Sequence, residues 1–236
     1  MDSVSRPQTR YFVTISPRLP WILAGIVTLL LIAHVGIQIY HYRVHEVGSL
    51  LKDTFDLNEE NNIPTWYSNS TLLLTSGLLL AIATGRRRER APDARHWLWL
   101  SVVFCFLALD EDAGLHETLN TMMDDLHGGV YITWAIPWML GVLVFAWIYV
   151  RFWWKLPPRI RLLFGLAGVG FIGGAVGVEQ LTLPADVDSD SLKFGLLTAL
   201  EEGLEMYSIV LFIHALLLYM RGSDRESVAL GVETAG

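Results

Sequence analysis

Charged side chains are scarce in this chain. They make up 17% of its 236 residues, whereas hydrophobic residues make up 53%. Such a composition is too apolar for an ordinary soluble domain and indicates that a lipid bilayer is the solvent. Because a membrane-spanning helix takes about 20 apolar residues, a chain of this length accommodates roughly six of them, and we expect no separate soluble domain.

The chain also has a single cysteine and none of the common nucleotide-binding motifs. The only cysteine, Cys105, cannot form an internal disulfide, so we interpret it as an apolar packing residue. The chain has no Walker A loop, no Rossmann glycine fingerprint and no G-x-S-x-G elbow. These absences argue against nucleotide-driven chemistry and against a serine hydrolase. No basic, aromatic face suggests a nucleic-acid partner.

The apolar residues are gathered into six runs of spanning length. The first run lacks a small-x-small cleavage site, so we interpret it as a retained helix and not as a signal peptide. We predict an all-α, polytopic membrane protein with a six-helix transmembrane domain over residues 19–220, and tails at residues 1–18 and 221–236. The predicted spans are Leu19–His41, Trp66–Gly85, His96–His116, Val130–Val150, Ile160–Leu181 and Phe194–Met220.

Lysine and arginine are divided unequally between the segments that connect these runs. Of the 17 in the chain, only Arg43, Lys52 and Lys193 follow the first, third or fifth run, and the other 14 lie in the tails and after the second and fourth runs. Because cytoplasmic segments retain positive charge, we predict a multi-pass protein of the plasma (cell inner) membrane with both termini in the cytoplasm. Aromatic residues near run ends, among them Tyr67 and Trp97, are interpreted as belts at the headgroup level.

Carboxylates are concentrated at one depth of the predicted bundle. Counting about 1.5 Å of rise per residue from the cytoplasmic end places acidic residues of spans three, five and six in the outer half of the membrane. His34 of span one and Asn69 of span two reach the same layer. The acidic layer has eight carboxylates: Asp110, Glu111, Asp112, Glu117, Glu179, Glu201, Glu202 and Glu205.

These carboxylates need compensation at that depth. An isolated carboxylate in the bilayer costs about 2.5 kcal/mol or more, so protons, bound metal ions or water in an open vestibule must stabilise the layer. Carboxylates from facing helices, together with histidine, form the ligand sets of di-iron and di-manganese bundles. The Glu-x-x-His spacing of those sites does not occur here, since the nearest acids, Glu111 and Asp112, lie at other separations from His116.

We predict a divalent metal site in this layer, with Fe, Mn and Zn not distinguished. Four residues would bind the ion directly, five would complete or tune its coordination, and two would orient the ligands through hydrogen bonds. The direct ligands would be Glu111, His116, Glu201 and Glu205. The residues that complete or tune the coordination would be Asp110, Asp112, Glu117, Glu179 and Glu202. The residues that orient the ligands would be His34 and Asn69.

Three functions fit such a layer. The preferred one is a metal-dependent membrane enzyme, an oxidoreductase or a hydrolase, that acts on a lipid-soluble substrate. The second is a proton or cation conductor or transporter, although the off-centre layer and the lack of an internal repeat argue against alternating access. The third is an accessory subunit of a larger membrane complex.

Span five is rich in glycine. G-x-x-x-G spacings occur at Gly170/Gly174 and at Gly173/Gly177, so the backbone of this span can approach its neighbours closely. We expect tight packing inside the bundle, which would deliver Glu179 to the acidic layer. Homodimerisation through this stripe is the alternative.

Overall fold

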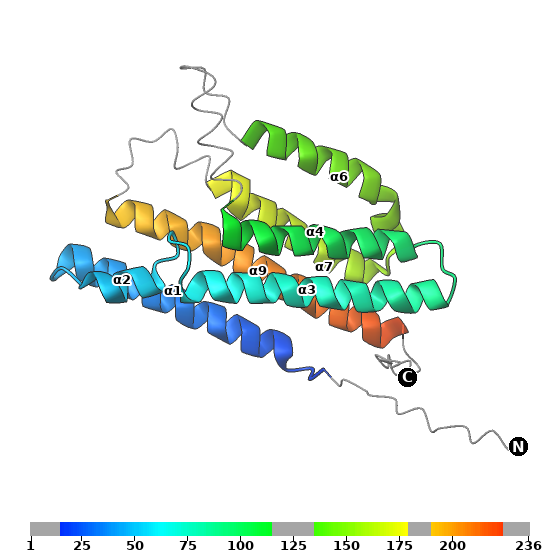
Figure 1. The fold of residues 1–236 in the computed structure, drawn as a ribbon, viewed down its shortest axis with the longest axis horizontal. Coiled ribbons are helices and arrows are strands. Elements are labelled where there is room, and N and C mark those ends of the chain that lie inside the picture. Colours follow the sequence, from blue (N-terminus) through cyan, green and yellow to red (C-terminus); the bar gives the residue numbers. More distant parts are fainter. Residues whose placement is uncertain (1–14, 115–134, 179–189, 224–236) are drawn as a thin grey trace, which may run out of the picture.

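The computed structural model describes residues 15–114, 135–178 and 190–223. Every regular element in these ranges is a helix, which confirms the all-α prediction. Figure 1 shows the long helices side by side in an elongated bundle, with α6 at its edge. In chain order the elements are α1 (Leu19–Arg43), α2 (Ser49–Phe55), α3 (Ile63–Arg88), α4 (Ala94–Ala113), α6 (Ala135–Lys155), α7 (Pro158–Ile172), the π-helical turn η1 (Gly173–Val178) and α9 (Leu192–Ser223).

Among the residues that the structure describes, four helical segments are long and apolar enough to cross a membrane. They are α1, α3, the continuous segment formed by α7 and η1, and α9 as far as Gly222. Their length and composition agree with the membrane class indicated by the sequence. The helices α4 and α6 overlap the third and fourth predicted runs, with α6 ending at Lys155 and not at Val150, but neither helix is among these four. Six spans and the direction of insertion therefore stay predictions.

The start of α3 is set by local capping. The side chain of Asn62 accepts a hydrogen bond from the backbone N–H of Thr65 at 3.1 Å, and Pro64 occupies the first turn. Asparagine caps the unpaired N–H groups of a helix start, and proline has no N–H to leave unpaired. For these reasons α3 begins at Ile63, three residues before the predicted start at Trp66.

The end of α4 corrects the third predicted span. Gly114 follows the helix with a φ of +53°, and its N–H bonds to the carbonyl oxygen of Asp110 at 2.9 Å. This left-handed conformation is the usual stop of a helix at glycine. The helix α4 therefore ends at Ala113, three residues before the predicted end of the third run at His116.

The helices α3 and α4 form a close pair through small polar side chains. Ser76 Oγ donates to the carbonyl oxygen of Ser101 at 2.8 Å, and Ser101 Oγ donates to that of Ser76 at 2.9 Å. Both residues are buried. Serine allows two backbones to approach and satisfies its own hydroxyl group in an apolar interior. This reciprocal contact fixes the relative height of the two helices.

The helix α9 is the centre of the bundle. It packs against α1, α3, α7 and η1, and its residues Ile213 and Leu216 are fully buried. Tyr67 and Trp97 are also buried, at 6% and 0% exposure, which corrects their interpretation as headgroup-level aromatics. The Trp97 ring instead contacts the rings of Phe152 and Tyr219, so it belongs to the core.

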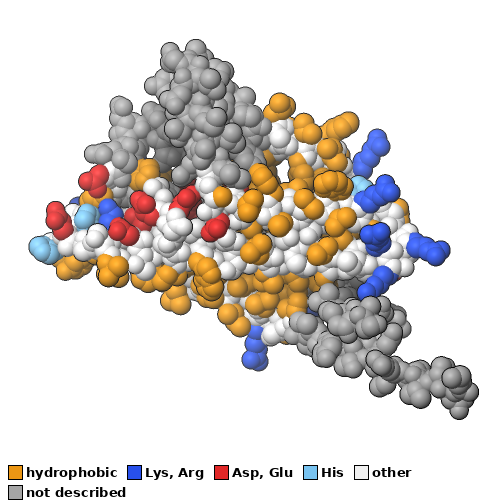
Figure 2. Space-filling view, in the orientation of Figure 1, with side chains coloured by type: hydrophobic (Ala, Val, Ile, Leu, Met, Phe, Trp, Pro, Cys, Tyr) orange, Lys and Arg blue, Asp and Glu red, His pale blue; other side chains and the backbone are white. Residues whose placement is uncertain are grey.

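The surface of the bundle is divided by chemistry. Figure 2 shows hydrophobic side chains over the middle of the visible face, lysine and arginine gathered at one end, and acidic side chains toward the other. Large apolar side chains are strongly exposed on α6, where Trp147 is 78% exposed. An apolar middle with charged ends is the surface that a lipid bilayer requires.

Candidate functional site between α4 and α9

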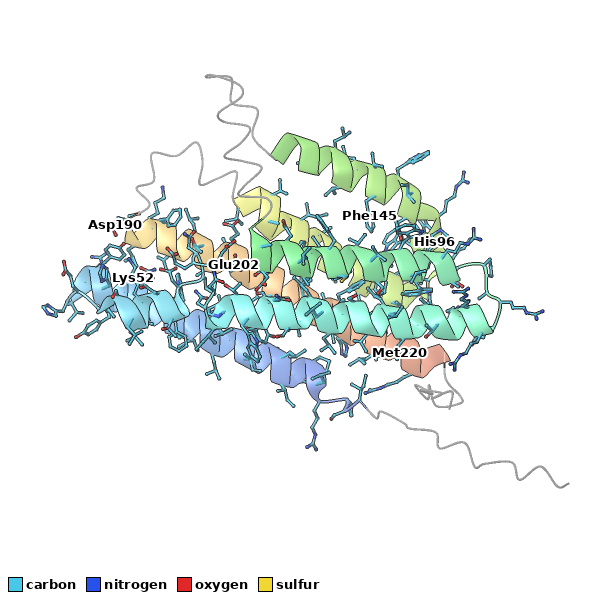
Figure 3. All side chains as sticks on the ribbon, in the orientation of Figure 1. Lys52, His96, Phe145, Asp190, Glu202 and Met220 are labelled. Carbon is cyan, nitrogen blue, oxygen red and sulfur yellow. The ribbon has the colours of Figure 1, made fainter. Side chains whose placement is uncertain are left out.

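Two helices supply the acidic residues of the layer that the structure describes. Asp110, Glu111 and Asp112 lie in the last turn of α4, whereas Glu201, Glu202 and Glu205 lie within α9. Figure 3 labels Glu202 close to the end of α4 where these acids are. Asp110 is buried, Asp112 is exposed, and the other four are partly buried. The two helices thus bring most of the predicted carboxylates into one region.

The surroundings of Glu202 define the electrostatic problem at this site. Its carboxyl group is close enough to interact electrostatically with Glu111 on α4 and with Glu201 on α9. Neighbouring carboxylates disfavour one another's ionised form, and an apolar interior strengthens that repulsion. A proton or a cation at this point would relieve it.

The turn η1 packs tightly against the same part of α9. A Cβ atom on Gly174 would lie 2.8 Å from the backbone oxygen of Glu201 and 2.9 Å from Cγ of Glu205. One turn earlier, a Cβ on Gly170 would collide with the hydroxyl of Ser208. The Gly170/Gly174 pair therefore serves internal packing, as expected from its spacing, and positions η1 beside the acidic turn of α9.

The other glycine pair does not share this role. Cβ atoms added at Gly173 and Gly177 would meet nothing within 4 Å among the residues that the structure describes. Homodimerisation through Gly173 and Gly177 stays a prediction.

One carboxylate near α4 was not included in the predicted site. Glu60, in the segment between α2 and α3, lies so close to Gly114 that a Cβ there would be 2.7 Å from Glu60 Oε1. The sequence signal was the acidic segment before α3, whose position relative to α4 only the fold reveals. A glycine at position 114 is favoured by its backbone angle, whereas the Glu60 carboxylate is the end of a flexible side chain that could move away from a Cβ atom.

The side-chain oxygen of Asn69 lacks a hydrogen-bond donor among the described residues. Its Oδ1 atom is buried and accepts no hydrogen bond from any residue in the described ranges. Counting two helical turns from the Ser76–Ser101 contact places Asn69 at the height of Ala108, less than one turn from Asp110 and Glu111. Asn69 thus lies at the level of the acidic layer, as the depth estimate predicted.

His34 has a different environment from the predicted one. Its Nδ1 atom accepts the N–H of Leu57 at 3.1 Å, and its Nε2 atom is 3.0 Å from the carbonyl oxygen of Gly195. Accepting at Nδ1 makes Nε2 the protonated donor of a neutral ring. Asp56 Oδ1 lies 3.6 Å from His34 Nδ1, and because the ring is neutral this contact is not an ion pair. The hydrogen bonds described for His34 thus join α1 to α9 and to the segment after α2.

Three predicted ligands, His116, Glu117 and Glu179, lie outside the described residues. Within the described ranges, no group of three histidine, cysteine or acidic side chains is arranged to hold a metal ion. The predicted set of metal ligands therefore stays untested as a whole.

The described part of the chain is an all-helical protein with apolar helices suited to a membrane and with carboxylates facing one another between two of them. Residues 21–220 match the model of a protein family described as a domain of unknown function (DUF8692), and the chain belongs to that family. No curated protein and no solved structure matches it.

Proposed function

We propose that the chain is a metal-dependent membrane enzyme that binds a divalent ion at the carboxylates between α4 and α9 and acts on a lipid-soluble substrate. The observation that carries this proposal is the position of Glu202, whose electrostatic neighbours are Glu111 and Glu201. A divalent cation stabilises adjacent carboxylates and gives the buried Oδ1 of Asn69 a positive group to face.

The proposed topology places this site in the outer half of the plasma membrane. Six spans with both termini in the cytoplasm are supported by the 14-to-3 distribution of lysine and arginine. The separation of basic and acidic ends in Figure 2 agrees with that arrangement. A lipid-soluble substrate would reach such a site from the membrane, without crossing an aqueous channel.

The proposed chemistry depends on the ion. Fe, Mn or Zn would polarise a substrate oxygen or activate water, and a redox-active ion would also support oxidation. In this proposal Glu111, Glu201 and Glu205 bind the ion with His116. Asp110, Asp112, Glu117, Glu179 and Glu202 complete or tune its coordination.

Elemental analysis of the full chain, purified in detergent without chelators, tests the proposal. We expect close to one or two equivalents of a transition metal, and loss of that metal in the double variant Glu201→Gln/Glu205→Gln. The variant Glu46→Gln removes an exposed carboxylate outside the acidic layer and should keep the metal. Less than a tenth of an equivalent in the unmodified protein, or unchanged metal in the double variant, would overturn the proposal.

A proton or cation conductor is the second candidate, and one observation favours it. A proton needs no set of converging ligands, and the described residues contain no ready group of three. Flux measured in liposomes distinguishes the two functions. Flux that disappears in Glu202→Gln, from a protein without metal, would support conduction, whereas metal without flux would support the enzyme.

A further inference from the structure

Basic side chains from two helices gather where α7 begins and α9 ends. This is the end of the bundle at which lysine and arginine are concentrated (Figure 2). The two helices run antiparallel, and the close approach of Gly170 to Ser208 sets their register. Arg159 lies 11 residues before Gly170, and Arg221 lies 13 residues after Ser208. At about 1.5 Å of rise per residue, the two arginines therefore begin at nearly the same height.

His214 lies near both arginines. Its ring is close enough to interact electrostatically with Arg159 and with Arg221. The ring is partly buried, and no hydrogen bond joins it to another of the described residues. Within the described ranges no acidic side chain forms an ion pair with either arginine, whereas Arg86, at the same end, pairs with Asp93 at 2.9 Å. Positive charges that gather without an acid attract an anion.

The start of α7 has the features of a segment at the level of lipid headgroups. The Arg161 guanidinium carbon lies 4.7 Å from the centroid of the Trp154 ring, which is exposed. Trp153 Nε1 donates to the carbonyl oxygen of Arg161 at 2.9 Å and ties α6 to α7. Exposed tryptophan and arginine are typical of this level of a bilayer. No side chain caps the first turn of α7, so its N–H groups add to the attraction for an anion.

An exposed apolar stripe continues from Arg159 along α7. Its members, Leu162, Leu166 and Val169, follow Arg159 by three, seven and ten residues and so share its face of the helix. All three are exposed. A free phosphate would contact only the basic side chains, whereas a phospholipid would also cover this stripe with an acyl chain. The stripe therefore favours a lipid as the source of the anion.

We propose that Arg159, His214 and Arg221 bind the phosphate of an anionic phospholipid whose acyl chain lies along the apolar stripe of α7. Guanidinium groups donate paired N–H bonds to phosphate oxygens, and an imidazole N–H supplies a further donor. The site is separate from the acidic layer. It depends neither on a metal ion nor on the direction of insertion, because the basic end meets lipid headgroups in either orientation.

Native mass spectrometry of the full chain in detergent, titrated with phosphatidylglycerol, tests this proposal. We expect one lipid to bind more tightly than phosphatidylcholine does. The double variant Arg159→Gln/Arg221→Gln changes two exposed side chains, so it should keep its Tm, and it should weaken this binding by at least about tenfold. The control Arg87→Gln/Arg88→Gln removes two exposed charges from α3 at the same end and should leave the affinity nearly unchanged.

Four outcomes would overturn the proposal. An unchanged affinity in the Arg159/Arg221 variant would exclude these side chains from the site. An equal loss in both double variants would mean that the basic end attracts lipid only through its total charge. Equal binding of phosphatidylcholine would show that the negative charge of the lipid is not recognised. Glycerol phosphate that displaces the lipid at equal concentration would identify a site for a soluble anion instead.

Discussion

His34 and Gly195 join the first and last long helices through a buried hydrogen bond, with His34 Nε2 at 3.0 Å from the Gly195 carbonyl oxygen. The same ring accepts the N–H of Leu57 through Nδ1. One side chain therefore connects α1, α9 and the segment that leads into α3. Because both ring nitrogens are engaged, this histidine has the geometry of a structural residue.

Replacing this ring should destabilise the protein. His34→Leu keeps a similar volume but leaves the Leu57 N–H and the Gly195 carbonyl without their partner, which should cost about 2 to 4 kcal/mol. Thermal unfolding in detergent should show a decrease in Tm of roughly 5 to 15 °C. The control His45→Leu, at an exposed position, should change Tm little. An unchanged Tm in His34→Leu would contradict the structural role.

Two adjacent glycines of η1 should respond differently to the same substitution. Gly174→Ala brings a Cβ within 2.8 Å of the Glu201 backbone oxygen and should destabilise the fold by about 1 to 3 kcal/mol. Gly173→Ala meets open space and should be neutral or slightly stabilising, since alanine favours a helix over glycine. Parallel unfolding measurements in detergent check this. If the two variants were equally stable, Gly174 would not be in close contact with α9.

The serine pair between α3 and α4 should be energetically coupled. Ser76→Ala and Ser101→Ala each remove one hydrogen bond to a backbone carbonyl oxygen, and both remove the contact between the two hydroxyls at 3.2 Å, which is the interaction that couples them. A double-mutant cycle should give a coupling energy of about 0.5 to 1.5 kcal/mol, the range found for hydrogen bonds between membrane helices. Coupling near zero would mean that the two hydroxyls do not depend on each other.

The proposed direction of insertion can be measured with introduced cysteines. In a Cys105→Ser background, an impermeant maleimide added to intact spheroplasts should label Glu46→Cys but not Glu89→Cys. Both positions are exposed, and they lie on opposite sides in the proposed topology. Disruption of the membrane should make both react. If only Glu89→Cys were labelled in intact spheroplasts, the orientation would be the opposite of the one proposed.

The regular structure was largely predictable because it depends on local properties of the chain. Hydrophobic runs identified the long helices, and Asn62 and Gly114 are ordinary helix start and stop signals. The helix α4 ends three residues before the predicted end of its run at His116, because Gly114 stops the helix while the apolar pattern continues. Trp97 was misplaced because its position near a run end resembles that of a headgroup-level aromatic, whereas three other aromatic rings bury it.

The site needed information that lies beyond local sequence. Helix periodicity placed the acids at one depth, but it did not show that Glu202 lies near Glu111 or that Glu60 approaches the end of α4. Such contacts depend on how each helix is rotated and on where the connecting segments return. These features are set by side-chain packing across the bundle.

By itself, the sequence determined the helical class, the apolar segments and the shared level of the acidic residues. These properties follow from composition and from a rise of about 1.5 Å per residue. Only the tertiary structure decided that His34 binds Gly195 and Leu57, that Gly174 presses against α9, and that two arginines lie near His214. The physical reason is that hydrogen-bond partners and close contacts belong to pairs of residues far apart in the chain, and only the packed bundle brings them together.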